Sequence, residues 1–448
     1  MEVKSGAVDL IRNNLKSLLE CKENGQVLRK QAPPSIYMVP SVVQDLSPSS
    51  FTPRVVAIGP LHRHDEHLQG FEVQKITYLN NLLHRFCMVP EQTLRKCVEK
   101  VIGSIDEIKA CYAVSTTYDD LELAKMMVID ACFILEFIQS VLVGLSVGTN
   151  TLIIGSIRKD MLLIENQIPY FILEDIFECT VLASGQMTSL TMYMSVFLRP
   201  YYFPEGNVVV PDASAPEHIL GFLHKYFQPA ERMPLNPWPS IKRHSAMELH
   251  RAGMKFKPYE DENWALAMEL ELPLPLFPWF HDFIAIPQFS WFRPPTLRMP
   301  KARIHDSSEL IFRNLLVYEH VKLYHERYVT SYVCAMDMLI NTPEDVALLV
   351  KSKVLVSLFG SYEEAADMIN KLCKNIPFKL YYKQQWEEMD VYYNSYWPNT
   401  LAGLKRTYFN NPWNIIALFA AFVLFALTVV QTIFTIKATN GTSVASNH

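Results

Sequence analysis

The sequence lacks the short motifs that mark most nucleotide-dependent enzymes and metal proteins. It contains no GxGxxG, no GxxxxGK[ST] and no protein-kinase motif set, so no nucleotide cofactor is expected. Its eight cysteines are dispersed and form no CxxC pair, which argues against a zinc site and against a disulfide scaffold. We therefore expect no cofactor, no metal site and a reducing compartment.

Dense positive charge and internal repeats are also missing. The net charge is −5 with a pI near 6.2, and the lysines and arginines are scattered, so nucleic acid is not an expected partner. What the sequence does have is apolar material. Half of its 448 residues are hydrophobic and 12% are aromatic, which is enough for a large buried core and excludes wholesale disorder.

Apolar spacing predicts a mainly α protein with a minor proline-rich extended or β portion. Residues 1–30 are expected to form an amphipathic helix, and residues 31–408 one large domain. Within it, residues 31–199 and 301–408 have helical spacing. Sixteen of the 28 prolines fall in residues 200–300, which excludes long helices there.

The C-terminal part predicts one transmembrane helix. Residues Ile415–Ile436 carry no charge over 22 positions. A helix of that length spans roughly 33 Å, which matches a hydrocarbon core of about 30 Å. Trp413 is expected at the membrane interface, and Lys405, Arg406 and Lys437 flank the span.

This span predicts a single-pass membrane protein with an anchor at 413–436 and a short tail at 437–448. Two basic residues precede the span and one follows it, so the large N-terminal part is expected in the cytosol, although the opposite orientation stays open. The N-terminus has no signal-peptide pattern. The plasma membrane and the endoplasmic reticulum are both open as locations. The apolar segment 126–148 is a weaker candidate span, because its Asp130 and Glu136 favour a buried helix of the main domain.

Two patterns resemble catalytic or metal-binding motifs. GLSVG at residues 144–148 matches GxSxG, but Ser146 follows a helical segment and not a strand, so we interpret it as a glycine-rich helix end. The run His62–His67 (HRHDEH) is rich in possible ligands but matches no metal-binding spacing, and a solvated polar loop is expected. The acids Asp130, Glu136 and Glu165 are expected to be paired structural groups, with Arg158 and Lys159 nearby in sequence.

The stretch DMLLIENQIPYFILEDIF (residues 160–177) places three polar side chains and a proline in apolar surroundings. Pro169 is expected to break or kink a helix near residue 168. Such a break leaves backbone groups without helical partners, and Glu165, Asn166 and Gln167 are positioned to supply them. We predict a buried polar clamp made of Glu165, Asn166, Gln167 and Pro169.

These segments together resemble the plant family called domain of unknown function 247. The resemblance covers residues 36–436 and depends on eight blocks in the expected order, which are SIYMVPSVVQDLSPSSFTPRVVAIGPLHR, FEVQKITYL, MVIDACFILEF, DMLLIENQIPYFIL, SAMELHRAGMKFK, LRMPKARIHDSSELIFRNLLVYEH, YVTSYVCAMDMLINTPEDVALL and YFNNPWNIIALFAAFVLFALTVVQTIF. Departures at Met38, Leu61, His62, Arg63 and Met247 mark a divergent member.

The resemblance implies no catalytic residues. Some relatives act in reproduction, as grass self-incompatibility determinants or as a suppressor of female organ development. The hypothesis is therefore a non-enzymatic, membrane-anchored recognition or signalling protein of plant reproduction. Its partners would be the bilayer, through residues 415–436, and proteins, with residues 60–70 and 200–240 as candidate specificity surfaces. The alternative is an enzyme of unrecognised fold that uses Glu165 or Ser146.

Overall fold

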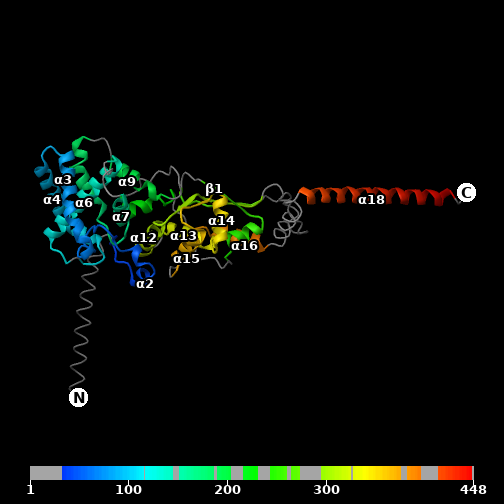
Figure 1. Ribbon diagram of the computed structural model, residues 1–448, viewed down its shortest axis with the longest axis horizontal. Helices are drawn as coiled ribbons and strands as arrows, with labels where there is room; N and C mark the ends of the chain where they lie inside the picture. Colours follow the sequence, from blue (N-terminus) through cyan, green and yellow to red (C-terminus); the bar gives the residue numbers. More distant parts are fainter. Residues whose placement is uncertain are drawn as a thin grey trace, which may run out of the picture.

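The protein is mainly helical, with a few short strands. In the computed structural model the described residues are 33–115, 117–144, 151–185, 189–202, 215–230, 243–259, 264–272, 294–323, 326–374, 381–394 and 412–445. Two groups of helices lie along the long axis of the body (Figure 1). One continuous cluster of buried apolar side chains extends through both groups, so the body has a single core.

The first group packs around helix α6, Asp120–Leu142. Almost every residue of α6 from Leu123 to Ile138 is buried, Asp130 and Glu136 included. Its neighbours are α3 (Gln69–Phe86), α4 (Pro90–Gly103), α8 (Tyr170–Cys179) and α9 (Leu190–Leu198). Residues 126–142 of the segment that was the weaker candidate span thus lie in the central helix of the first group.

Shorter elements complete this group and connect it to the second. They are α2 (Ser41–Gln44), η2 (Pro48–Ser50), η3 (Glu66–Leu68), α5 (Ile105–Cys111), α7 (Thr151–Asp160), η5 (Leu182–Ser184), η6 (Arg199–Tyr201), α10 (Ile219–Lys225) and α11 (Ala246–Arg251). Residues 51–60, which follow η2, form no regular element, and all but three of them are buried against the helices.

The second group contains α12 (Ser308–Val321), α13 (Tyr328–Leu339), α14 (Pro343–Lys351), α15 (Tyr362–Leu372) and α16 (Lys383–Asn394). Helix α14 begins with proline after an N-cap threonine, whose backbone N–H donates to a carboxylate three residues on at 3.0 Å. Proline suits the first helical position because its missing N–H would have no helical acceptor there.

The described part of the proline-rich region contributes three strands. Strands β1 (Lys255–Tyr259), β3 (Thr296–Pro300) and β2 (Glu269–Glu271) pair in that order, parallel and then antiparallel. Pro258 lies on edge strand β1, where a missing N–H costs no central hydrogen bond. A second pair joins β4 (Ala302–Ile304) to β5 (Leu355–Ser357). The predicted minor β portion is confirmed, although β4 lies just after residue 300 and β5 lies well inside residues 301–408, where helical spacing was predicted.

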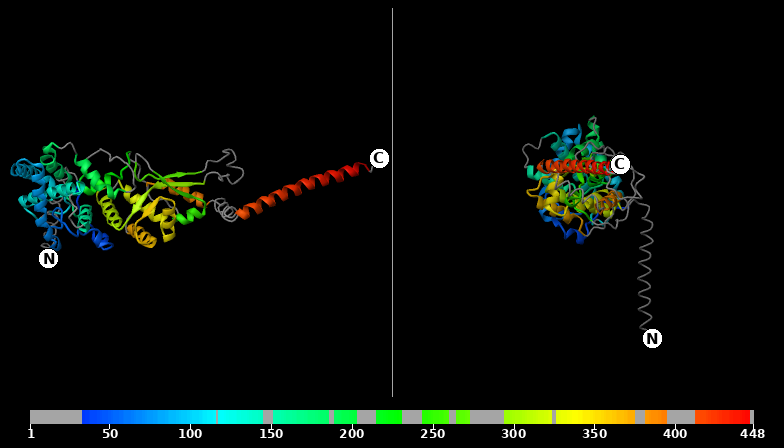
Figure 2. Two further views of the ribbon diagram at one scale, coloured as in Figure 1. Left: turned by 45° about the horizontal axis from the view of Figure 1, so that its top comes forward. Right: turned by 90° about the vertical axis from the view of Figure 1, so that its right-hand side faces the viewer.

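Helix α18, Pro412–Ala445, covers the predicted anchor. It extends away from the body in Figure 1 and in the left view of Figure 2, and large apolar side chains along it are exposed, including Trp413, Phe422 and Phe425. Among the residues that the structure describes, no helix has both the length and the apolarity that crossing a membrane requires. The anchor is therefore not shown and stays a prediction. Residues 1–30, Lys405 and Arg406 lie outside the described residues.

Candidate functional site

The IENQIP segment lies in a completely buried loop. Helix α7 ends at Asp160 and α8 begins at Tyr170, so the predicted break near residue 168 is wrong in its extent. The nine residues 161–169 are all buried and nonhelical, and Pro169 is the N-cap of α8. A buried loop is rare, because its backbone N–H and C=O groups need partners other than water.

Two amide side chains supply partners within the loop. The Gln167 Nε2 group donates to the carbonyl oxygens of Met161 at 2.8 Å and Leu163 at 2.7 Å. The Asn166 Nδ2 group donates to the carbonyl oxygen of Asp160 at 3.0 Å. These bonds satisfy the carbonyl groups left where α7 ends, so the loop takes a fixed shape without helical hydrogen bonds.

The same loop also binds the extended chain at residues 54–59. The Asn166 Oδ1 atom accepts from the Ile58 N–H at 2.6 Å, and Asn166 Nδ2 donates to the Val56 carbonyl at 2.9 Å. The carboxylate of Asp160 accepts three consecutive N–H groups, from residues 54–56, at 2.7 to 3.0 Å. Burial raises the pKa of Asp160, although these three bonds oppose the rise. Side chains at the end of α7 and in the loop therefore hold the backbone of a segment about 105 residues earlier in the sequence through hydrogen bonds.

Glu165 is fully engaged and closed to solvent. It is 1% exposed, accepts from the Val39 N–H, and contacts His62 Nε2 through its other oxygen at 3.0 Å. The His62 Nδ1 atom lies 2.8 Å from Asp65. His62 is buried, which corrects the expected solvated loop at this position. Burial acts to lower the pKa of His62, but the hydrogen bonds to the two carboxylates outweigh it and raise the pKa.

The other buried acids pair with bases that are distant in sequence. Lys75 is 0% exposed, and its ammonium lies 2.6 Å from Asp130 and donates to the Ala57 carbonyl. The second oxygen of Asp130 accepts the Gly59 N–H at 2.8 Å. Among the described residues, the salt-bridge partners of these acids do not include Arg158 or Lys159. The bases nearest in sequence are thus not the partners, because Asp130 pairs with Lys75 and Glu136 pairs with Arg85 at 2.6 Å.

Gly59 lies where the extended chain passes closest to the buried loop. Its φ is +72°, and a Cβ there would lie 2.5 Å from the Gln167 carbonyl oxygen and 2.9 Å from the Tyr112 hydroxyl. Only glycine adopts this conformation without strain and also leaves space for the carbonyl. The glycine therefore permits the close approach that the polar bonds exploit.

Asn314 joins this junction to the second helical group. It lies on α12, accepts from the Ile164 N–H at 2.9 Å and donates to the Ser50 carbonyl at 2.7 Å. The loop, the extended chain and α12 thus meet at one buried polar center. We call the set Asp130, Asp160, Glu165, Asn166, Gln167 and Asn314 the polar junction.

The geometry of the polar junction suits holding chain segments together. Its side-chain polar atoms are within hydrogen-bond distance of protein groups, and every member is buried. In the part of the chain that the structure describes, no group of three or more His, Cys, Asp or Glu side chains is arranged to hold a metal ion. Sequence inspection missed Asp160 and Asn314 as members, although Asp160 begins the apolar stretch DMLLIENQIPYF and Asn314 lies within LIFRNLLV, which is a usable signal.

The remaining predicted site residues lie elsewhere. Trp413 is 76% exposed near the start of α18. Lys437 is within α18, with its side chain outside the description. Ser146 also lies outside the described residues. The structure thus brings Glu165, Asn166, Gln167 and Pro169 together.

Comparison with known proteins identifies relatives along almost the whole chain. A family model described as DUF247, plant protein of unknown function, matches residues 36–427. The UPF0481 protein At3g47200 of Arabidopsis thaliana is 25% identical, over 88% of this chain and 85% of that protein. The putative UPF0481 protein At3g02645 of the same plant is 24% identical, over 89% of each. No solved structure matches.

Proposed function

The chain belongs to the plant protein family DUF247, and from that premise we propose that it is a non-enzymatic recognition or signalling protein held on a membrane. The observation that carries the non-enzymatic part is the closed state of Glu165. A general acid or base must reach a substrate proton directly or through one water. Here both carboxylate oxygens are occupied by protein donors in a side chain that is 1% exposed.

Two features support the bilayer as a partner. Residues 415–436 carry no charged side chain, and α18 presents phenylalanine, leucine and valine side chains to its surroundings. Exposed apolar surface on this scale is unfavourable in water and is relieved by lipid or by a protein groove. A single pass with the large N-terminal part in the cytosol is the arrangement that we propose, at the plasma membrane or the endoplasmic reticulum.

Reproduction is the process that we propose, because the family resemblance implies it. Recognition would then depend on protein partners, with residues 60–70 and 200–240 as candidate specificity surfaces. Because His62 is buried, the candidate surface at residues 60–70 consists of the exposed side chains of that segment, which include Glu66 and His67. Proximity labelling from the native tissue, with residues 412–445 intact, tests whether specific neighbours exist and whether substitutions at these surfaces remove them.

Alkaline extraction of membranes tests the anchor. We expect the full chain to stay in the pellet after the wash. Replacing Phe422, Phe425 and Val429 by lysine should release it to the supernatant, because each lysine costs roughly 2.5 to 3.5 kcal/mol at the centre of a span. Continued pelleting of this variant would overturn the anchor.

A matched control separates the anchor from general changes in charge. Val73, Leu121 and Val391 are 75%, 68% and 69% exposed on the body, and their replacement by lysine adds the same three positive charges without touching α18. We expect this control to pellet like the natural sequence. Release of the control as well would show that added charge, not the span, determines the distribution.

The enzyme alternative has its own test. A water-soluble carbodiimide modifies accessible carboxyl groups, and peptide mapping locates them. We expect Glu165 to resist modification in the folded protein while exposed acids such as Glu66 react. Rapid, selective labelling of Glu165 would indicate an open, reactive site and would favour the enzyme.

A further inference from the structure

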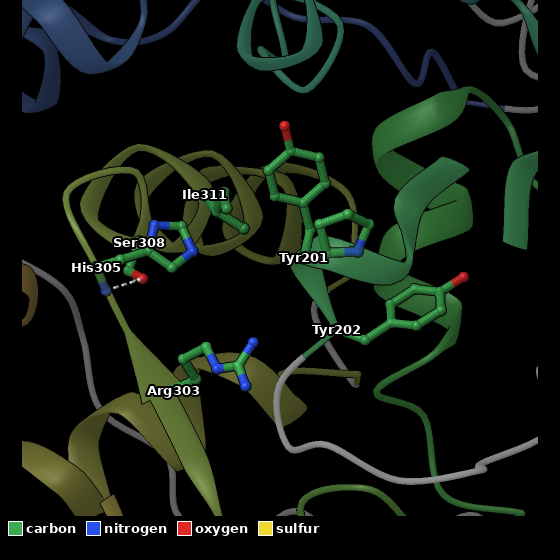
Figure 3. Close-up of a pocket in the computed structure, with 7 residues that line it drawn as sticks. Tyr201, Tyr202, Arg303, His305, Ser308 and Ile311 are labelled. Carbon is green, nitrogen blue, oxygen red and sulfur yellow. Dashed lines mark hydrogen bonds between the residues drawn. The ribbon is translucent and has the colours of Figure 1, made fainter. Parts of the chain in front are cut away.

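A small cleft and a long helix face lie outside the polar junction. The cleft is lined by Tyr201 and Arg303, among other residues (Figure 3). Part of its polar lining is bonded to itself, because the His305 N–H donates to the Ser308 hydroxyl at 2.9 Å and the His305 ring accepts the Ser307 N–H at 3.1 Å. The helix is α18, which extends away from the body and presents its side chains to the surroundings (Figure 1). Its surface is therefore the one open to a partner.

Helix α18 carries four exposed polar side chains within its uncharged stretch. They are Thr428, Gln431, Thr432 and Thr435. Each threonine hydroxyl donates to the carbonyl oxygen four residues earlier, at 2.8 Å. Among the described residues, the side-chain amide of Gln431 forms no hydrogen bond. The threonine hydroxyls thus donate within their own helix, whereas the Gln431 amide needs a partner from outside it.

Gln431 lies on a line of residues that repeats along the helix. The members of this line are alternately four and three residues apart, and they are Ala417, Ala421, Leu424, Thr428, Gln431 and Thr435. We call these six residues the polar seam. Their spacing is that of the core positions of a left-handed coiled coil, which keep one line of side chains against a neighbouring helix. Small residues at such positions let two helix backbones approach closely in a bilayer.

The opposite face of α18 is bulky and apolar. It carries Phe419, Phe422, Val429 and Ile433, all of which are exposed. With about 3.6 residues per turn, these positions lie on the side of the helix away from the polar seam. Lipid tails are as apolar as these side chains, whereas hydrogen-bonding groups in hydrocarbon gain from contact with another helix. The two faces therefore indicate which side of α18 meets lipid and which side meets protein.

The position of Gln431 keeps its amide away from water. Gln431 lies five positions before Ile436, so its backbone is about 7.5 Å inside the end of the uncharged stretch at about 1.5 Å per residue. Side chains on a helix lean toward the N-terminus, which here is the direction away from the nearer end. A polar amide held there without a hydrogen bond is unfavourable in hydrocarbon.

We propose that a second copy of this chain covers the polar seam, so that the protein forms a parallel dimer through α18. The proposal rests on the membrane anchor proposed above. One span per chain means that the second helix comes from another molecule. Two copies of a single-pass protein enter the bilayer from the same side, so their Gln431 side chains lie at the same depth. An amide both donates and accepts, and a two-fold axis therefore lets each Gln431 bond the other.

Energy transfer between full-length copies in phosphatidylcholine vesicles tests the pairing. Copies that carry a donor or an acceptor fluorescent protein at the N-terminus are reconstituted together at a series of protein-to-lipid ratios. We expect energy transfer that saturates with protein density and falls when unlabelled full chain is added. Gln431→Leu should raise the dissociation constant of the dimer about tenfold, which corresponds to about 1.4 kcal/mol.

Two control variants isolate the amide on the polar seam. Gln431→Asn keeps an amide at this position and should retain most of the energy transfer. Thr432→Val removes a hydroxyl at nearly the same depth but beside the seam, and should leave the dissociation constant unchanged. Because α18 extends away from the body, we expect the urea midpoint of the body to be the same in all variants. Equal weakening by Thr432→Val and Gln431→Leu would overturn the polar seam as the interface.

Alkaline extraction of the same vesicles separates failure of the pairing from failure of the anchor. A Gln431→Leu variant that stays in the pellet and loses energy transfer supports the dimer. A natural sequence that pellets without saturating energy transfer, or whose energy transfer survives Gln431→Leu, overturns the dimer and leaves the anchor in place. The seam would then face lipid or a different protein. A natural sequence that the wash releases overturns the anchor and the dimer together.

Discussion

Replacement of Asn166 by leucine is the most direct test of the polar junction. The natural side chain bonds the Ile58 N–H and the carbonyl oxygens of Val56 and Asp160. Leucine has similar bulk and no polar atoms. All three backbone groups would lose their bond to the side chain in an interior that excludes water.

The expected magnitude follows from counting the groups left without partners. The Asp160 carbonyl keeps a second, longer contact with the Leu163 N–H at 3.4 Å, so it is only partly lost. The Ile58 N–H and the Val56 carbonyl have no other described partner. Each unsatisfied buried group costs about 1 to 3 kcal/mol, so the free energy of unfolding should fall by about 2 to 6 kcal/mol. That is a large share of a typical total of about 5 to 15 kcal/mol.

Urea unfolding of the full chain in detergent, followed by helical circular dichroism, measures this loss. The matched control is Asn81→Leu, at an exposed position of α3, where a change within about 0.5 kcal/mol is expected. If the two variants unfold at the same urea concentration, the Asn166 bonds contribute nothing net and the account of the junction is refuted.

Three further substitutions probe the same region by the same assay. Gly59→Ala should lower the free energy of unfolding by at least about 2 kcal/mol, because a Cβ at φ +72° is strained and lies 2.5 Å from a carbonyl oxygen. The control Gly155→Ala, which has open space in α7, should be neutral or stabilising. Equal effects of the two substitutions would contradict the close approach at Gly59. Lys75→Met should cost about 3 to 5 kcal/mol by leaving the Asp130 carboxylate buried without its ammonium, and adding Asp130→Asn should recover part of the loss; no recovery would count against the pairing. For His62 the folded pKa is raised above 6.5, so its contribution is complete below pH 6.5 and is lost as pH rises through the folded pKa. The stability gap between the natural sequence and His62→Gln should therefore narrow between pH 6 and pH 9, and a gap that widens would reverse the sign of the coupling.

Element types were predictable from sequence where local rules decide them. Helical spacing, the proline count of residues 200–300 and the proline that opens α14 each act over a few neighbouring residues. The segment around Asp130 was correctly assigned to a buried helix because two acids within an apolar run need partners inside a protein. Such inferences need no knowledge of distant contacts.

The partners of the buried polar groups were not predictable. His62 was expected in solvent because its neighbours in sequence are polar, but its position depends on Glu165, which is 103 residues away. Asp130 pairs with Lys75 across 55 residues, and neither sequence spacing nor composition encodes that meeting.

The sequence by itself determined that DMLLIENQIPYFILEDIF could not continue as one helix and that its polar side chains needed hydrogen-bond partners. Only the tertiary structure decided what they bind, because a hydrogen bond requires atoms within about 3 Å and chain folding alone brings Asn166 to Ile58. Local chemistry specified the need for partners. The packed arrangement of α6, α12 and the extended chain specified which partners, and it closed the site to solvent.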